Sequence, residues 1–142
     1  MLLIKFTKEI IKRFHNSKIK FVPVQNMSIS EVQELLLKSK IYIDFGNHPG
    51  RDRFPREAAL FGCSVITNKK GSAKNKVDVN IIEEYKFQDE SELELNKIVD
   101  LINDITINFK SHHDNFNSYR TTILKDEKRF DLELKKIFLK NE

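Results

Sequence analysis

The sequence predicts an α/β protein with a parallel, three-layer sheet of about four strands and a carboxyl-terminal helical tail. Up to about residue 90, apolar runs of strand length alternate with segments of helical spacing, which is typical of a parallel sheet. Beyond that point, apolar residues recur only at helical spacing. The chain has 142 residues, about the length of one domain. We divide it into a sheet part over 1–90 and a helical tail over 91–142 packed on it.

The amino-terminal part predicts two helices with a strand between them. A helix over 2–14 is indicated by four apolar residues at helical spacing: Leu3, Phe6, Ile10 and Phe14. The run KIKFVPV at 18–24 indicates a short strand, with Pro23 near its end. Ser28 and Glu31 have the spacing of a capping box, in which the two side chains bind the first free amides of a helix. We expect that helix to run to about Ser39.

Residues 41–67, IYIDFGNHPGRDRFPREAALFGCSVIT, predict two buried strands joined by a short helix. The strands are 41–45 and 63–67. Asp44 lies inside the first, and because a buried carboxylate needs a partner, we expect it to pair with an arginine. Pro55 suits the first position of the helix, and Gly62 ends it after two turns. A last short strand is expected near 85–87.

The tail predicts three helices from three groups of apolar residues. The groups are Leu95, Ile98, Val99, Ile102, Ile105 and Phe109, then Phe116, Tyr119 and Ile123, then Phe130, Leu134, Ile137 and Phe138. Alone, these helices would expose wide apolar stripes. We therefore expect them to pack on the sheet.

Composition favours a cytoplasmic protein. No run approaches the roughly 18 apolar residues of a transmembrane helix, although the amphipathic helix over 2–14 could contact a membrane surface peripherally. Cys63 is the only cysteine, which excludes an internal disulfide, and its place in an apolar strand indicates a buried, inert thiol. The adjacent His112 and His113 would face different directions on a helix, so we predict no metal site. We predict no cofactor either.

The charge balance favours a small anionic ligand over nucleic acid. Lys and Arg number 25 against 21 Asp and Glu, a net charge of +4. The basic residues are scattered, whereas nucleic-acid binding would be supported by a concentrated basic stripe. We therefore predict no nucleic-acid partner.

The loops that follow the strands at 41–45 and 63–67 predict a pocket for a phosphorylated ligand. Right-handed crossovers place both loops at the same edge of the sheet. A helix amino terminus there favours phosphate, and glycines allow close backbone approach. The residues that we expect in this pocket are His48, Gly50, Arg51, Arg53, Arg56, Lys70 and Gly71. His48 either braces the loop or donates to a sugar or phosphate oxygen.

Glu57 lies in the first turn of the Pro55 helix and has two interpretations. It can complement the helix dipole or form a salt bridge with one of the nearby arginines. Alternatively, its carboxylate accepts hydrogen bonds from ribose hydroxyls beside a diphosphate, as in other nucleotide sites.

The segment HPGRDRFPREAALFGCSVIT resembles the signature of GT-B glycosyltransferases, in their carboxyl-terminal nucleotide-sugar-binding half, which is a Rossmann-like domain. The matching positions are Glu57-Ala58, Gly62 and Val65-Ile66. The resemblance covers about Lys18 to Phe87, and it implies that Glu57 contacts the ribose of the donor. Pro49 stands where many retaining members carry a second glutamate against the donor sugar. The resemblance therefore does not imply a retaining reaction.

The resemblance implies that residues 1–90 are part of a Rossmann-like donor-binding domain. The partner ligand would be a nucleotide sugar, and sugar transfer would need a missing amino-terminal acceptor domain or a partner subunit. The alternative is a non-enzymatic, flavodoxin-like module that binds a phosphorylated ligand or a protein partner.

Overall fold

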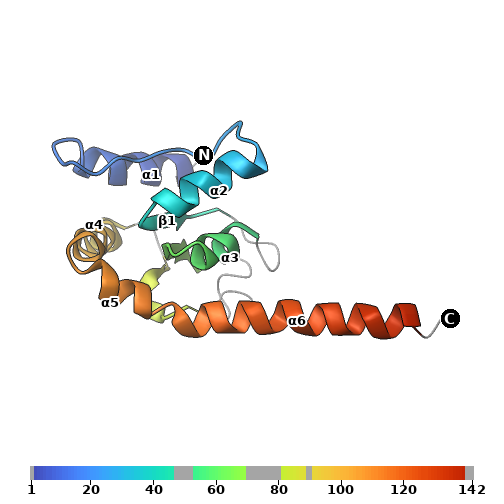
Figure 1. The fold of residues 1–142 in the computed structure, drawn as a ribbon. Coiled ribbons are helices and arrows are strands. Elements are labelled where there is room, and N and C mark those ends of the chain that lie inside the picture. Colours follow the sequence, from blue (N-terminus) through green and yellow to red (C-terminus); the bar gives the residue numbers. More distant parts are fainter. Residues whose placement is uncertain (1, 47–52, 70–80, 89–90, 140–142) are drawn as a thin grey trace.

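The computed structural model describes residues 2–46, 53–69, 81–88 and 91–139, and Figure 1 shows their arrangement. In chain order the elements are α1 (Leu2–Arg13), α2 (Ile29–Lys38), β1 (Ile41–Asp44), α3 (Arg53–Leu60), β2 (Ser64–Asn68), the 3₁₀ turn η2 (Glu83–Tyr85), β3 (Lys86–Phe87), α4 (Glu92–Ile107), α5 (Phe109–Asp114) and α6 (Asn117–Leu139). The prediction of an α/β protein with a parallel sheet is confirmed. The described residues contain three strands instead of about four.

Strand β2 is the centre of the sheet, and β1 and β3 pair with it in parallel on either side. Ile41 lies opposite Ser64, Asp44 opposite Thr67, and Thr67 opposite Lys86. All five residues of β2 are buried. Strands covered on both faces are rich in apolar residues, and Cys63, Val65 and Ile66 are the apolar residues that indicated this one in the sequence.

The predicted strand at 18–24 is wrong. Residues 19–25 belong to no helix or strand, and Val22 is exposed. Ile19 and Phe21 instead pack against the outside of the core, with the Phe21 ring centroid 5.7 Å from that of Phe14. Apolar alternation alone does not make a strand, because a strand also needs a neighbouring backbone to pair with.

Helix α2 begins as predicted. The Glu31 amide donates to Ser28 Oγ at 3.3 Å, and the Ser28 amide donates to Glu31 Oε2 at 2.6 Å. The second of these bonds lowers the pKa of the Glu31 carboxyl. Helix α3 already includes Arg53, so the prediction that Pro55 is the first helical residue is wrong. Pro55 still lies in the first turn, where its missing N–H costs no hydrogen bond.

Gly62 ends α3 as predicted, and its φ of +95° is in the left-handed region. The Gly62 amide donates to Ala59 O at 3.0 Å, and the Cys63 amide donates to Ala58 O at 2.9 Å. This pair of bonds is the Schellman motif, which satisfies the last carbonyls of the helix. The turn sends the chain directly into β2.

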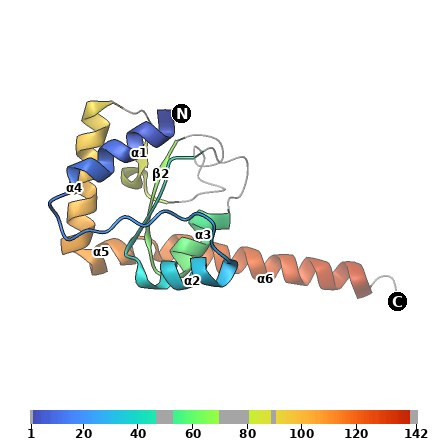
Figure 2. The ribbon, with the colours of Figure 1, turned by 90° about the horizontal axis from the view of Figure 1, so that it is seen from above.

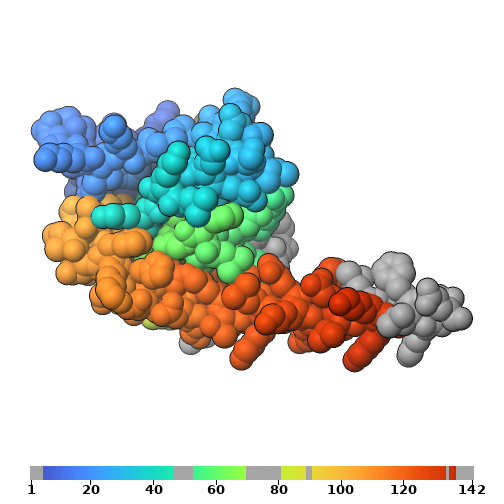
Figure 3. All heavy atoms as spheres, in the orientation of Figure 1, coloured from blue at the N-terminus to red at the C-terminus, as the bar shows by residue number. Residues whose placement is uncertain are grey.

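The last two predicted helices are one continuous helix, α6, because residues 124–129 contain neither glycine nor proline. Its first turns pack against α3, and Tyr119 and Ile123 are buried there, as is Phe116 directly before the helix. Figures 1 and 2 show the later turns extending past the rest of the molecule. The space-filling view in Figure 3 shows the same projection.

Arg120 fastens the first part of α6 to two other helices. Its Nε donates to Ala59 O at 2.7 Å, near the end of α3, and its Nη1 donates to His113 O at 2.9 Å, near the end of α5. Carbonyls at helix ends lack partners within their own helix and carry partial negative charge, which favours a guanidinium. Burial lowers the pKa of Arg120.

Cys63 joins α2 to the start of β2. Its thiol is fully buried and lies 3.3 Å from both Leu36 O and Ser39 O. Burial raises its pKa to about 11. The prediction that the thiol is buried is confirmed, and its raised pKa favours the unreactive protonated form.

Gly62→Ala should lower the free energy of unfolding by about 1 kcal/mol, because alanine resists a positive φ. An added Cβ would meet His113 at an ordinary 3.5 Å, so the loss is conformational rather than steric. Urea unfolding followed by circular dichroism measures the change. Gly62→Asn should cost less, since asparagine tolerates this region better. Equal losses in the two variants would contradict the conformational argument.

The buried Cys63 thiol should make the protein less stable in alkali. Its raised pKa stabilises the native state fully below pH 9, the ordinary thiol value, and this contribution is lost as the pH rises toward 11. A shift of this size corresponds to about 2–3 kcal/mol. Urea unfolding between pH 8 and 11 should therefore fall more steeply for the natural protein than for Cys63→Ala. Parallel curves would refute the assignment.

Candidate functional site

The carboxyl ends of the three parallel strands meet at one edge of the sheet. Asn68, at the end of β2, ties this edge together: its Nδ2 donates to Phe45 O at 2.6 Å and to Gly46 O at 2.8 Å. On the other side, the Lys69 amide donates to Phe87 O at 3.0 Å. The chain leaving β1, the end of β2 and the end of β3 are thus held at fixed positions. Ligands of open parallel sheets bind at this edge.

Asp44 shapes the start of the first loop. Its Oδ1 accepts from the Gly46 amide at 2.8 Å, and its Oδ2 accepts from the Tyr42 hydroxyl at 3.0 Å. A Cβ on residue 46 would lie 2.9 Å from Asp44 Oδ1, so a larger residue here would displace the carboxylate from this turn. These two contacts of Asp44, with Gly46 and Tyr42, do not include the arginine that we expected as its partner. Asp44 is half-buried and has a local role in the turn.

On the far side of the first loop, α3 brings Arg53 and Glu57 together. Arg53 Nε donates to Glu57 Oε1 at 2.5 Å, across one helical turn. Arg53 is exposed, whereas the Glu57 side chain is only 23% exposed and Arg56 is half-buried. The salt-bridge interpretation of Glu57 is therefore confirmed. The other predicted pocket residues lie outside the described residues: His48, Gly50, Arg51, Lys70 and Gly71.

A hollow of about 390 Å³ lies beside the end of β3. Both basic and acidic side chains line it, and Lys69 Nζ pairs with Glu83 Oε2 at 2.9 Å. Its lining is Lys69, Glu83, Glu84, Lys86, Phe87, Gln88, Glu94, Lys97 and Leu101. Lys86, in β3, is only 4% exposed although its side chain is charged. The volume is within the range of small-molecule sites.

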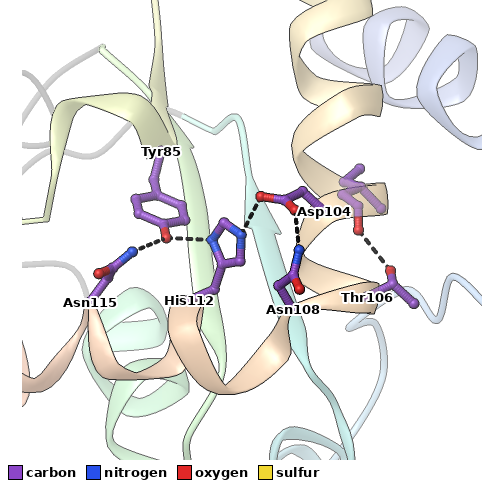
Figure 4. Close-up of polar contacts among 7 residues, drawn as sticks. Tyr85, Asp104, Thr106, Asn108, His112 and Asn115 are labelled. Atoms are coloured by element: carbon purple, nitrogen blue, oxygen red, sulfur yellow. Dashed lines mark hydrogen bonds and ion pairs between the residues drawn. The ribbon is translucent and has the colours of Figure 1, made fainter.

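A second polar cluster joins η2 to α4 and α5 (Figure 4). Tyr85 Oη lies 2.6 Å from His112 Nδ1, and His112 Nε2 lies 2.7 Å from Asp104 Oδ2. Asn115 donates to Tyr85 Oη at 2.9 Å, and Asn108 donates to Asp104 Oδ1 at 2.7 Å. We refer to these five residues as the Tyr85 network.

A neutral imidazole satisfies this chain of bonds. Asp104 can only accept, so Nε2 of His112 carries the proton, and Nδ1 accepts from the Tyr85 hydroxyl. Burial raises the pKa of Tyr85. The hydrogen bond from Asn108, followed by the one with His112, lowers the pKa of Asp104. Because Tyr85 is fully buried, a substrate cannot reach its hydroxyl, and we assign the network a structural role.

The Tyr85 network and the burial of Lys86 were not predicted from the sequence. Tyr85 and His112 are 27 positions apart, and no local spacing connects them. Lys86 occupies a strand too short to show the alternation that would have placed its side chain. Tyr85 stands between Glu84 and Lys86, so its neighbours in the sequence did not indicate that its hydroxyl is buried.

No family model matches the chain, and neither a curated protein nor a solved structure matches it. Among the described residues, no three His, Cys, Asp or Glu side chains are grouped so that they could hold a metal ion. Of the helices that the structure describes, none is both long and apolar enough to cross a membrane.

Tyr85→Phe should lower the free energy of unfolding by about 1–3 kcal/mol, because it leaves His112 Nδ1 buried without a donor. Urea unfolding measures the loss. Tyr42→Phe is the matched control, since it removes a hydroxyl bonded to the half-buried Asp44, which water can replace. The control should lose less than about 1 kcal/mol. Equal losses would show that burial of the network contributes nothing.

Proposed function

We propose that the carboxyl edge of the sheet binds a nucleotide sugar, and that the chain is the donor-binding portion of a glycosyltransferase of the GT-B kind. The observation that carries this proposal is the β1–α3–β2 unit. Its parallel strands end at one edge, and α3 returns from that edge with Arg53, Arg56 and Glu57 in its first turns. Matching sequence positions therefore occupy an arrangement that suits the proposed site.

Helix α3 supplies the groups that such a ligand needs. Its amino end favours the negative charge of a diphosphate, and Arg53 adds an exposed guanidinium beside it. Helix α3 is anchored at its other end by the Gly62 turn and along its length by contacts with β1 and β2. A fixed helix keeps these groups in position before the ligand arrives, which reduces the ordering cost of binding.

The ion pair with Arg53 is compatible with a ribose contact by Glu57. One carboxylate oxygen accepts from Arg53, but an ionised carboxylate can accept about four hydrogen bonds. In this role, Arg53 orients the Glu57 carboxylate, and the carboxylate accepts from the two ribose hydroxyls. The same guanidinium, with its further N–H groups, can face the phosphates.

The hollow beside β3 supports a ligand larger than phosphate alone. It begins at Lys69, directly after β2, and continues along β3 to Leu101 on α4. Lysines and glutamates around the hollow can bind hydroxyl-rich groups such as a sugar, because they offer both donors and acceptors. The apolar rim of Phe87 and Leu101 can contact a flat ring face.

Glu57→Ala should weaken nucleotide binding at least tenfold while changing stability by less than about 1 kcal/mol, since an ion pair across one helical turn with an exposed arginine contributes little. Calorimetric titration with UDP, GDP, ADP and CMP at low salt measures the affinity, and urea unfolding measures the stability.

Glu9→Ala is the matched control. It also removes a carboxylate paired within one helix, here with Lys12 at 2.7 Å on α1. This variant should bind as the natural protein does. Saturable binding that is equally strong in Glu57→Ala would exclude the ribose contact. Failure of the natural, folded chain to bind any of the four nucleotides would favour the non-enzymatic interpretation.

A further inference from the structure

The apolar face of α6 continues beyond the part that packs on the protein. Tyr119 and Ile123 are buried on one face of the helix. At 3.6 residues per turn, Phe130 lies on that same face, within about 20° of both. Phe130 is 61% exposed, however, because it lies on the part of α6 that extends past the other elements (Figures 1 and 2). The same apolar face is thus covered in the first part of the helix and open in the second.

The charges on this open part are segregated. Three acidic positions lie within about 60° of Phe130 around the helix, and a fourth lies about 100° away. They are Asp126, Glu127, Glu133 and Asp131. Of the basic residues from 124 to 136, Arg129 lies about 100° from Phe130, and the other four lie about 120° or more away, toward the opposite face. The basic residues are Lys125, Lys128, Arg129, Lys135 and Lys136.

We propose that this face of α6, centred on Phe130 and flanked by Glu127, Asp131 and Glu133, docks a basic amphipathic helix of another protein. The apolar anchors of such a helix would cover Phe130, and its lysines or arginines would meet the flanking carboxylates. An apolar stripe with charges of one sign along its borders selects a partner with the opposite sign. This docking face is separate from the nucleotide site on the sheet.

Charge complementarity distinguishes this partner from two other occupants. A second copy of α6 on the same face would place carboxylates against carboxylates, which opposes pairing. An anionic membrane would repel the acidic border, whereas helices that lie on such membranes carry lysine and arginine beside their apolar face. The basic residues of α6 are on the wrong side for that role.

Binding of a partner would also stabilise the extended part of α6. Beyond Ile123, the helix extends past the other described elements (Figures 1 and 2), and in proteins most helical stability comes from packing of an amphipathic face. A docked helix would bury Phe130 and hold these turns. The chain thus presents an apolar face whose helical state a partner would strengthen.

The test uses two designed helical peptides of about 20 residues with the same leucine stripe. One has lysines beside the stripe, and the other has glutamates. Fluorescence anisotropy with the full chain should show saturable binding of the lysine peptide and at least tenfold weaker binding of the glutamate peptide. Phe130→Ser should weaken binding of the lysine peptide at least tenfold. Leu132→Ser is the matched control, because Leu132 is 58% exposed on the opposite face, and it should change affinity less than twofold.

Charge reversal tests the border separately. The double variant Glu127→Lys and Asp131→Lys should reverse the preference between the two peptides. Equal binding of both peptides, no binding of the lysine peptide, or equal effects of Phe130→Ser and Leu132→Ser would overturn the proposal. A Phe130-dependent dimer in sedimentation would assign the face to a second copy instead. Phe130-dependent binding to vesicles of anionic lipid would assign it to a membrane.

Discussion

The parallel pairing of β2 with β1 and β3 is the interaction on which the rest of the structure depends. Because β2 is paired along both edges and buried throughout, the other elements must cover it or lead into and out of it. The Gly62 turn delivers the chain from α3 into β2, and Cys63 ties the start of the strand to the end of α2. Parallel pairing also fixes where the strands end. The location of the candidate site at one edge is thus a consequence of topology, before any side chain is considered.

Buried polar groups connect the helical tail to this sheet at specific points. Arg120 binds carbonyls near the ends of α3 and α5, and the Tyr85 network joins η2 to α4 and α5. Such groups are expensive to bury unless satisfied, so they favour one arrangement of the helices over others. The result is a tail that is held firmly through Ile123 and then extends past the other described elements. A fixed base is what a projecting helix needs in order to present one face to a partner.

Sequence predicted the elements that local chemistry determines. The Ser28–Glu31 capping box, the Gly62 stop and the two buried strands each leave a signal within a few residues. The prediction of a strand at 18–24 was wrong because a strand must pair with a backbone that is distant in sequence. The pattern of KIKFVPV is the same whether or not such a neighbouring backbone is present. The two helices expected after Phe116 were one, since a polar stretch without glycine or proline need not interrupt a helix. At the site, the Arg53–Glu57 pair follows from helical spacing, whereas the Asn68 bridge and the Tyr85 network depend on tertiary contacts.

The central claim is that the carboxyl edge of the sheet is the nucleotide site, and amide chemical shifts test it most directly. A titration with UDP, GDP, ADP and CMP should shift the resonances of Gly46, Asn68, Lys69 and the first turn of α3 for one of the nucleotides. The amides of α1 should stay unchanged. Shifts confined to α1 or α6, or no saturable shifts with any of the four nucleotides, would contradict the account.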